Sequence, residues 1–412
     1  MLDAWVDPTR QRDSSLFDTR SAVSKDVGPT ARSAARPYCQ GVQTTVRPGP
    51  GRAVHTRTPL RLAFLLPGGV ALLAGLDAAL TLLGLPAPVD SLRLAEAHGL
   101  LMVLGFVGTV VALERAVALG RAVGYAVPAA LGLGAVTTVL PLPDVVGRAL
   151  FVLGTVGLCA LYRVLWTRQP ALAVAVEALG AGLALGAAIL WAAGVDVPYL
   201  APWLAVFLVL TIAGERLELA RVGMLRGRVE LTVVALGLTL AASVVLALVA
   251  PRAGYPALGA TLLALVVVLA RHDVARRTVR ATGLPRYMAA CLLAGYAWLA
   301  VAGAIWLVGG PIYSGRGYDA VLHAVFLGFV ITMIMAHAPV ILPAVLRRPL
   351  PYHPVMYGPF ALLQLSLAVR LLVGDGYDVP AVVQVAGVVN IVALLAFVGV
   401  VVVSVVRGER RA

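Results

Sequence analysis

Two histidines lie at matching places in two apolar segments of the sequence. His98 stands near the start of "AHGLLMVLGFVGTVVALER" (97–115), and His323 near the start of "LHAVFLGFVITMIMAHA" (322–338). Each falls about five residues into a predicted membrane-spanning helix, roughly 6–8 Å below its outer edge at about 1.5 Å of rise per residue. Two imidazoles at one depth are what the two axial positions of a haem iron require. The alternative is that each histidine is a polar side chain hydrogen-bonded to a neighbouring helix.

Haem propionates would need cationic partners near the same surface. Arg93 precedes the segment of His98, Arg316 precedes the segment of His323, and Arg370 lies within another apolar run. An arginine inside a membrane span is costly and usually functional, which makes Arg370 the most informative of the three. Snorkelling of its side chain to the membrane interface explains it equally well.

Further ionisable side chains lie within or at the ends of apolar segments. His337, Glu114 and Glu215 could together bind a non-haem metal, although each glutamate is followed by an arginine, as in ordinary charge pairs at a membrane interface. Glu177 is a candidate proton carrier or a partner in an ion pair within the bundle. Asp77 is a candidate partner for an arginine or for a ligating imidazole.

The composition is that of a chain that crosses a membrane many times. Of its 412 residues, 60% are hydrophobic and 13% are charged, and the mean hydropathy is +0.92. A soluble domain is about one-quarter charged, and apolar runs of about 18 residues or more predict membrane-spanning helices. The predicted fold class is therefore an all-α integral membrane protein whose first partner is the lipid bilayer.

Twelve spans are predicted, separated by short polar breaks. Residues 1–58 are polar and rich in Arg, Ser, Thr and Pro, which predicts a disordered cytoplasmic tail; residues 59–407 form the twelve-helix domain, and 408–412 a cytoplasmic end. The spans lie at 61–84, 94–115, 123–142, 146–166, 171–194, 199–220, 229–250, 254–271, 288–309, 319–346, 355–374 and 379–406.

The distribution of charge predicts the orientation. The formal net charge is +13, which on a soluble protein would suit nucleic acid. Here most arginines lie at the ends of the even-numbered spans or in the loops after them, and most aspartates on the opposite side, so no nucleic-acid partner is expected. Because cytoplasmic loops carry the excess of positive charge, both termini are predicted to be cytoplasmic.

An internal repeat relates the second, sixth and tenth spans. "FVGTVVALERA" from Phe106, "FLVLTIAGERL" from Phe207 and "FVITMIMAHAP" from Phe329 align without gaps, which superposes Glu114, Glu215 and His337. The equal spacing in span number predicts three pseudo-symmetric repeats of four helices. Repeats often share a binding site at their interface.

These segments resemble a known family. "AHGLLMVLGF", with His98, resembles the second helix of the haem-copper oxidase catalytic subunit, and "LHAVFLGFVITMIMAHAP", with His323, is similar to its tenth helix. Those helices supply the ligands of a low-spin haem in a fold of twelve helices in three repeats. Over residues 60–406 the closest resemblance is to the NnrS family, twelve-span bacterial proteins associated with haem, copper and tolerance of nitric oxide.

The resemblance implies a haem-copper-oxidase-like arrangement in the bacterial inner membrane, a b-type haem on His98 and His323, and redox chemistry or nitric-oxide defence with a redox partner protein. It also implies copper, but the sixth and seventh spans lack the histidines of an oxidase copper site, so no complete oxygen-reducing centre is expected. Two alternatives remain. One is a transporter of a small solute or metal ion that uses Asp77, Glu177 and His337. The other is a non-catalytic scaffold or sensor for a redox partner.

Overall fold

We describe the chain from a computed structural model, which places residues 58–220 and 227–409. The tail predicted over 1–58 lies outside the described residues, except that Thr58 begins the first helix. Of the end predicted over 408–412, only the first two residues are described, as the close of the last helix. Every regular element in the described part of the chain is a helix.

The elements follow one another with short connections. In chain order they are α1 (Thr58–Leu82), α2 (Leu92–Leu100), η1 (Leu101–Gly108), α3 (Thr109–Leu119), η2 (Ala122–Tyr125), α4 (Ala126–Val139), α5 (Asp144–Arg168), α6 (Leu172–Ala192), α7 (Val197–Ala220), α8 (Arg228–Val249), α9 (Pro251–His272), α10 (Ala275–Thr278), α11 (Gly283–Gly309), α12 (Gly315–His323), η3 (Ala324–Ile331), α13 (Thr332–Leu346), η4 (Pro354–Met356), α14 (Tyr357–Val369), η5 (Arg370–Asp375) and α15 (Pro380–Glu409).

Twelve helices within the described ranges are long and apolar enough to cross a membrane, which confirms the predicted number of spans. Several are composite: α2, η1 and α3 form the second span, and α12, η3 and α13 form the tenth. The ninth span begins at Gly283, about five residues before the predicted start at 288. The prediction began after Pro285, but the first turn of a helix tolerates proline because its N–H groups have no intrahelical acceptor.

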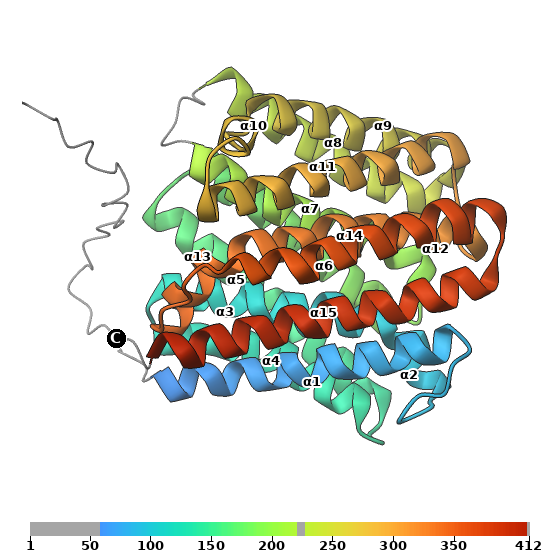
Figure 1. Cartoon of the computed structure of the whole chain (residues 1–412), viewed down its shortest axis with the longest axis horizontal. Helices are drawn as coiled ribbons and strands as arrows, with labels where there is room; N and C mark the ends of the chain where they lie inside the picture. Colours follow the sequence, from blue (N-terminus) through green and yellow to red (C-terminus); the bar gives the residue numbers. More distant parts are fainter. Residues whose placement is uncertain (1–57, 221–226, 410–412) are drawn as a thin grey trace, which may run out of the picture. The chain divides into compact units, whose positions relative to one another are not determined.

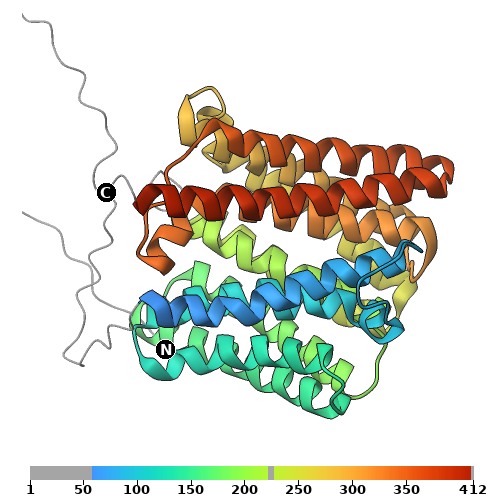
Figure 2. The same cartoon turned by 60° about the horizontal axis from the view of Figure 1, so that its bottom comes forward.

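The long helices run roughly along one direction in both views (Figures 1 and 2). Neighbours in the chain pack against one another, as α4 does with α5, α6 with α7, and α8 with α9. Short loops favour this arrangement of neighbouring helices. A helix satisfies all its backbone hydrogen bonds internally, which is what a segment surrounded by lipid requires.

The second, sixth and tenth spans occupy the centre of the bundle. Buried residues make up 72%, 78% and 67% of their most apolar windows, against 50% or less in each of the other nine and 22% in α15. These are the three spans that the internal alignment relates. Polar side chains on them consequently face other helices, where an ionisable group needs a partner or a ligand.

The second and tenth spans share an irregularity that sequence patterns did not predict. Each contains a π-helical stretch, η1 and η3, and the two coincide in the alignment of Phe106 with Phe329. A third such stretch, η5, ends the eleventh span. π-Helical turns are rare and occur frequently at functional sites.

Close helix contacts depend on small residues, as is usual in membrane bundles. At Gly259 on α9, a Cβ atom would meet the backbone of Gly303 and Leu307 on α11. Gly182 on α6, in contrast, has nothing near a built Cβ. The glycine at 259 therefore allows the backbones of α9 and α11 to touch.

We predict that Gly259→Leu destabilises the protein by about 1–3 kcal/mol or more, because overpacking forces the two backbones apart. Gly182→Leu is the matched control and should leave stability close to that of the wild type. Denaturation in detergent, followed by circular dichroism, measures both. Equal stability of the two variants would contradict the assigned contact between α9 and α11.

Candidate functional site

A cavity of about 860 Å³ lies among the central spans and is also lined by α1, α5 and α15. Its volume falls within the range of about 300–1,000 Å³ that is usual for ligand pockets. All three π-helical stretches of the described chain border it, through Met102 of η1, Phe326 of η3 and Arg370 of η5. The wall is mixed: charged side chains such as Asp144, Arg148 and Asp319 line it together with many aliphatic and a few aromatic side chains.

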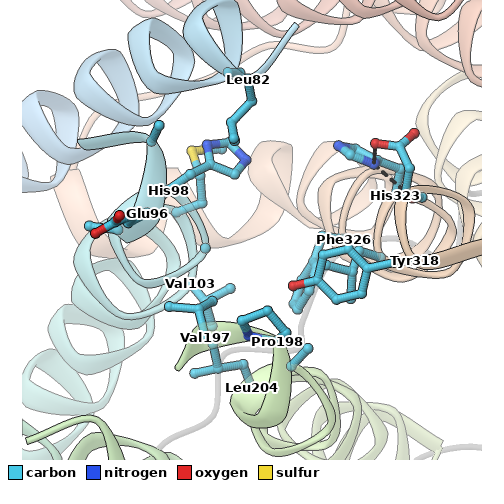
Figure 3. A pocket seen from close by; sticks show the side chains of 18 of the residues that line it. Leu82, Glu96, His98, Val103, Val197, Pro198, Leu204, Tyr318, His323 and Phe326 are labelled. Atoms are coloured by element: carbon cyan, nitrogen blue, oxygen red, sulfur yellow. Dashed lines mark hydrogen bonds and ion pairs between the residues drawn. The ribbon is translucent and has the colours of Figure 1, made fainter. Parts of the chain in front are cut away.

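His98 and His323 line this cavity from opposite walls, and Figure 3 shows their rings pointing toward one another. The Nδ1–H of His98 donates a hydrogen bond of 2.8 Å to the carbonyl oxygen of Gly75 on α1. In the neutral imidazole this contact leaves the lone pair on Nε2. That nitrogen has no hydrogen-bond partner among the described residues, so it is available to ligate a metal.

His323 is held in the same way but by more groups. Its Nδ1 donates to the carbonyl oxygen of Asp319 at 2.8 Å and lies 3.2 Å from Oδ1 of the same residue. Asp319 in turn accepts a bidentate pair from the buried Arg370, with Nε–Oδ2 2.8 Å and Nη2–Oδ1 2.7 Å. A carboxylate behind a histidine orients the ring and raises its basicity as a ligand.

Two of the three arginines expected to meet anionic groups already have acidic partners at the cavity. Arg370 pairs with Asp319, and Arg93 pairs with Asp144 at 2.7 Å while also donating to two carbonyl groups beyond the end of α4. Arg316 does not line the cavity. It is half-exposed and lies 3.8 Å from the carboxylate of Asp378.

Asp77 and Glu177 also lie outside the cavity lining. Asp77 accepts a hydrogen bond of 3.1 Å from the backbone N–H of Val89, so it fastens the loop after α1 and does not orient a ligating histidine. Glu177 is fully buried on α6 and lies 3.4 Å from Arg115, the ion-pair role expected for it. His337 does not line the cavity either, so none of the three residues of the transporter hypothesis borders it.

The pairs Glu114–Arg115 and Glu215–Arg216 differ from the surface pairs that the sequence suggested. Arg115 is buried and contacts three carboxylates, at 3.0 Å from Glu215 and at 3.4 Å from both Glu114 and Glu177. Its guanidinium carbon also lies 5.9 Å from the centre of the Tyr162 ring. One cation therefore ties together the second, fifth and sixth spans.

The structure does not gather His337, Glu114 and Glu215 into one metal-binding group. His337 donates from Nδ1 to the carbonyl oxygen of Met333, and its Nε2 accepts from buried Arg216, while both glutamates contact Arg115. No group of three or more metal-ligating side chains occurs among the described residues. The alignment placed these residues at equivalent positions in sequence, but Arg115 and Arg216 bind the oxygen and nitrogen atoms that a metal would have needed.

The comparisons with known proteins identify one family. The family model described as "Domain of unknown function (DUF8744)" matches residues 61–406, which is nearly all of the described helical region. The chain belongs to the DUF8744 family. No curated protein and no solved structure matches it.

The DUF8744 structure adds three residues to the cavity that sequence reasoning did not single out. Asp319 stands four residues before His323 on one helix face, and that spacing was the available signal. Arg148 lines the cavity with its guanidinium carbon 5.1 Å from the Trp191 ring, and its Nε is buried without a hydrogen-bond partner. Asn390 is a buried amide within the most apolar span.

We predict that Arg115→Met destabilises this DUF8744 protein by about 3–5 kcal/mol, because it leaves buried carboxylates without their cation. Adding Glu177→Gln to that variant should recover part of the loss, since one of the abandoned charges is removed. The double-mutant cycle is measured by denaturation in detergent. Strictly additive effects would show that Arg115 and Glu177 do not interact.

Proposed function

We propose that the chain is a haem-binding integral membrane protein in which His98 and His323 would ligate the iron of a b-type haem. The observation that carries the proposal is the pair of imidazoles on opposite walls of one cavity, each with Nδ1 anchored and Nε2 available. His337 also donates from Nδ1 to a backbone carbonyl, but Arg216 occupies its Nε2, so His98 and His323 are distinguished by the unpartnered Nε2 atoms that they present to one cavity.

The donor set fits the group. Two neutral imidazoles suit a haem iron, and the apolar part of the wall suits the face and edge of a porphyrin. Arg148 is the cavity-lining cation best able to meet a propionate, because Arg93 and Arg370 are already paired with aspartates. A haem bound here would supply one-electron chemistry, while the chain orients the rings and encloses the site.

Three features of the bundle support an oxidase-like arrangement of three repeats. The aligned spans are the most buried ones, the π-helical stretches η1 and η3 coincide in the alignment, and His98 and His323 stand at the start of the corresponding composite spans. The arginine-rich connections support cytoplasmic termini in a bacterial inner membrane. The resemblance to the NnrS family supports redox chemistry or nitric-oxide defence with a redox partner protein.

The first test is the absorbance spectrum of the purified protein. We predict a Soret band in the wild type that is lost or strongly reduced in both His98→Ala and His323→Ala. His337→Ala is the matched control and should keep the band, because Arg216 and Met333 hold that histidine outside the cavity. A wild type without a Soret band, or a Soret band that is unchanged in both ligand variants, would contradict the proposal.

The second test concerns the carboxylate behind His323. Asp319→Asn should weaken haem retention by about 10–100-fold, because loss of the partner of a ligating histidine has an effect of that size. Haem transfer to an apo-globin acceptor measures retention. Asp378→Asn, at an exposed aspartate on the same side of the bundle, should behave like the wild type. Equal haem retention in the two variants would show that Asp319 does not support a haem ligand.

A further inference from the structure

Asn390 on α15 is an unusual residue in the cavity wall. It is 3% exposed, it lines the cavity, and neither atom of its side-chain amide has a hydrogen-bond partner. Burying an amide without a partner costs about 1–3 kcal/mol by protein mutational data. An apolar residue of similar size would avoid that cost, so the amide is expected to meet a group that the chain itself does not supply.

The position of Asn390 indicates which kind of molecule reaches it. The residue lies ten positions after Pro380, where α15 begins, or about 15 Å along the helix. That distance is about half of a hydrocarbon core of roughly 30 Å. Ile391 and Leu394 line the cavity beside it, so the molecule must carry an apolar body together with a hydrogen-bonding group.

Part of the cavity lining lies at the apolar surface of the bundle. Leu82 and Leu83, at the end of α1, line the cavity, and Leu82 is 60% exposed. The carbonyl of Leu83 accepts a hydrogen bond of 2.9 Å from the side chain of Gln384 on α15. The cavity lining therefore includes an exposed apolar side chain close to the contact between the end of α1 and α15, which suits a molecule dissolved in the membrane.

We propose that this cavity binds a quinone and its quinol, with a ring oxygen at the amide of Asn390. An amide matches both oxidation states, since Nδ2–H donates to the carbonyl of a quinone and Oδ1 accepts from the hydroxyl of a quinol. An aliphatic lipid chain has no group for either atom. The proposal goes beyond haem binding and requires no haem for the contact itself.

Two probes of similar shape test the proposal: decyl-benzoquinone and decylbenzene, which lacks the carbonyl groups. Titration calorimetry of the full chain in detergent should show that the wild type prefers the quinone by about tenfold. Asn390→Leu should abolish this preference while keeping or raising the thermal stability, because the unpartnered amide is gone. Val385→Leu, on an exposed face of the same helix, should retain the wild-type preference.

The outcomes are separable. A wild type that binds both probes equally overturns the proposal even if the leucine variant does not fold. Loss of stability in Asn390→Leu with an unchanged preference assigns the amide a structural role instead. A shifted Soret band in that variant, with the quinone preference intact, places the amide against haem and also overturns the proposal. If the protein prefers the quinone but has no Soret band, the haem proposal is rejected and the quinone proposal stands.

Discussion

A charge inside a membrane bundle must have a partner, and much of this structure follows from that constraint. The cost of an isolated charge in a low-dielectric interior exceeds the stability of most domains. Arg115 and Arg370, both buried, accordingly contact carboxylates contributed by other helices. These ion pairs fix how the spans lie relative to one another, because hydrophobicity does not distinguish a neighbouring helix from lipid.

The two ends of the central spans meet this constraint differently. Toward one end, Arg216 donates a hydrogen bond to Nε2 of His337, and Arg115 forms ion pairs with neighbouring carboxylates. These groups therefore have partners within the chain. Toward the other end, backbone carbonyls and Asp319 hold only one nitrogen of His98 and of His323. The second nitrogen of each ring remains directed at a cavity. This difference in the second nitrogen, more than the presence of histidine, distinguishes a ligand site from a structural contact.

Sequence reasoning predicted the twelve spans, and it singled out the two histidines that line the cavity, because both leave local signals. Apolar length defines a helix in lipid, and His98 and His323 interrupt otherwise apolar runs. Sequence reasoning did not identify the ion-pair partners, because they lie far apart in the sequence. Arg115 contacts Glu215, which is 100 positions away, and Arg370 contacts Asp319, which is 51 positions away. The π-helical stretches were also missed, since nothing in "LMVLGFVG" distinguishes a wide turn from an ordinary one.

Buried polar groups without a hydrogen bond differ in how strongly they indicate a bound ligand. Both carboxylate oxygens of Glu177 lack one, yet Arg115 lies 3.4 Å away and compensates its charge. Asn390 carries no charge that a distant arginine could compensate, and hydrogen bonds act only at contact. An orphaned amide in a cavity wall is therefore stronger evidence for a ligand than an orphaned carboxylate in an ion cluster. The bundle compensates the charges of Arg115 and Arg370 internally, and at this cavity it leaves open donors and acceptors that a bound molecule can meet.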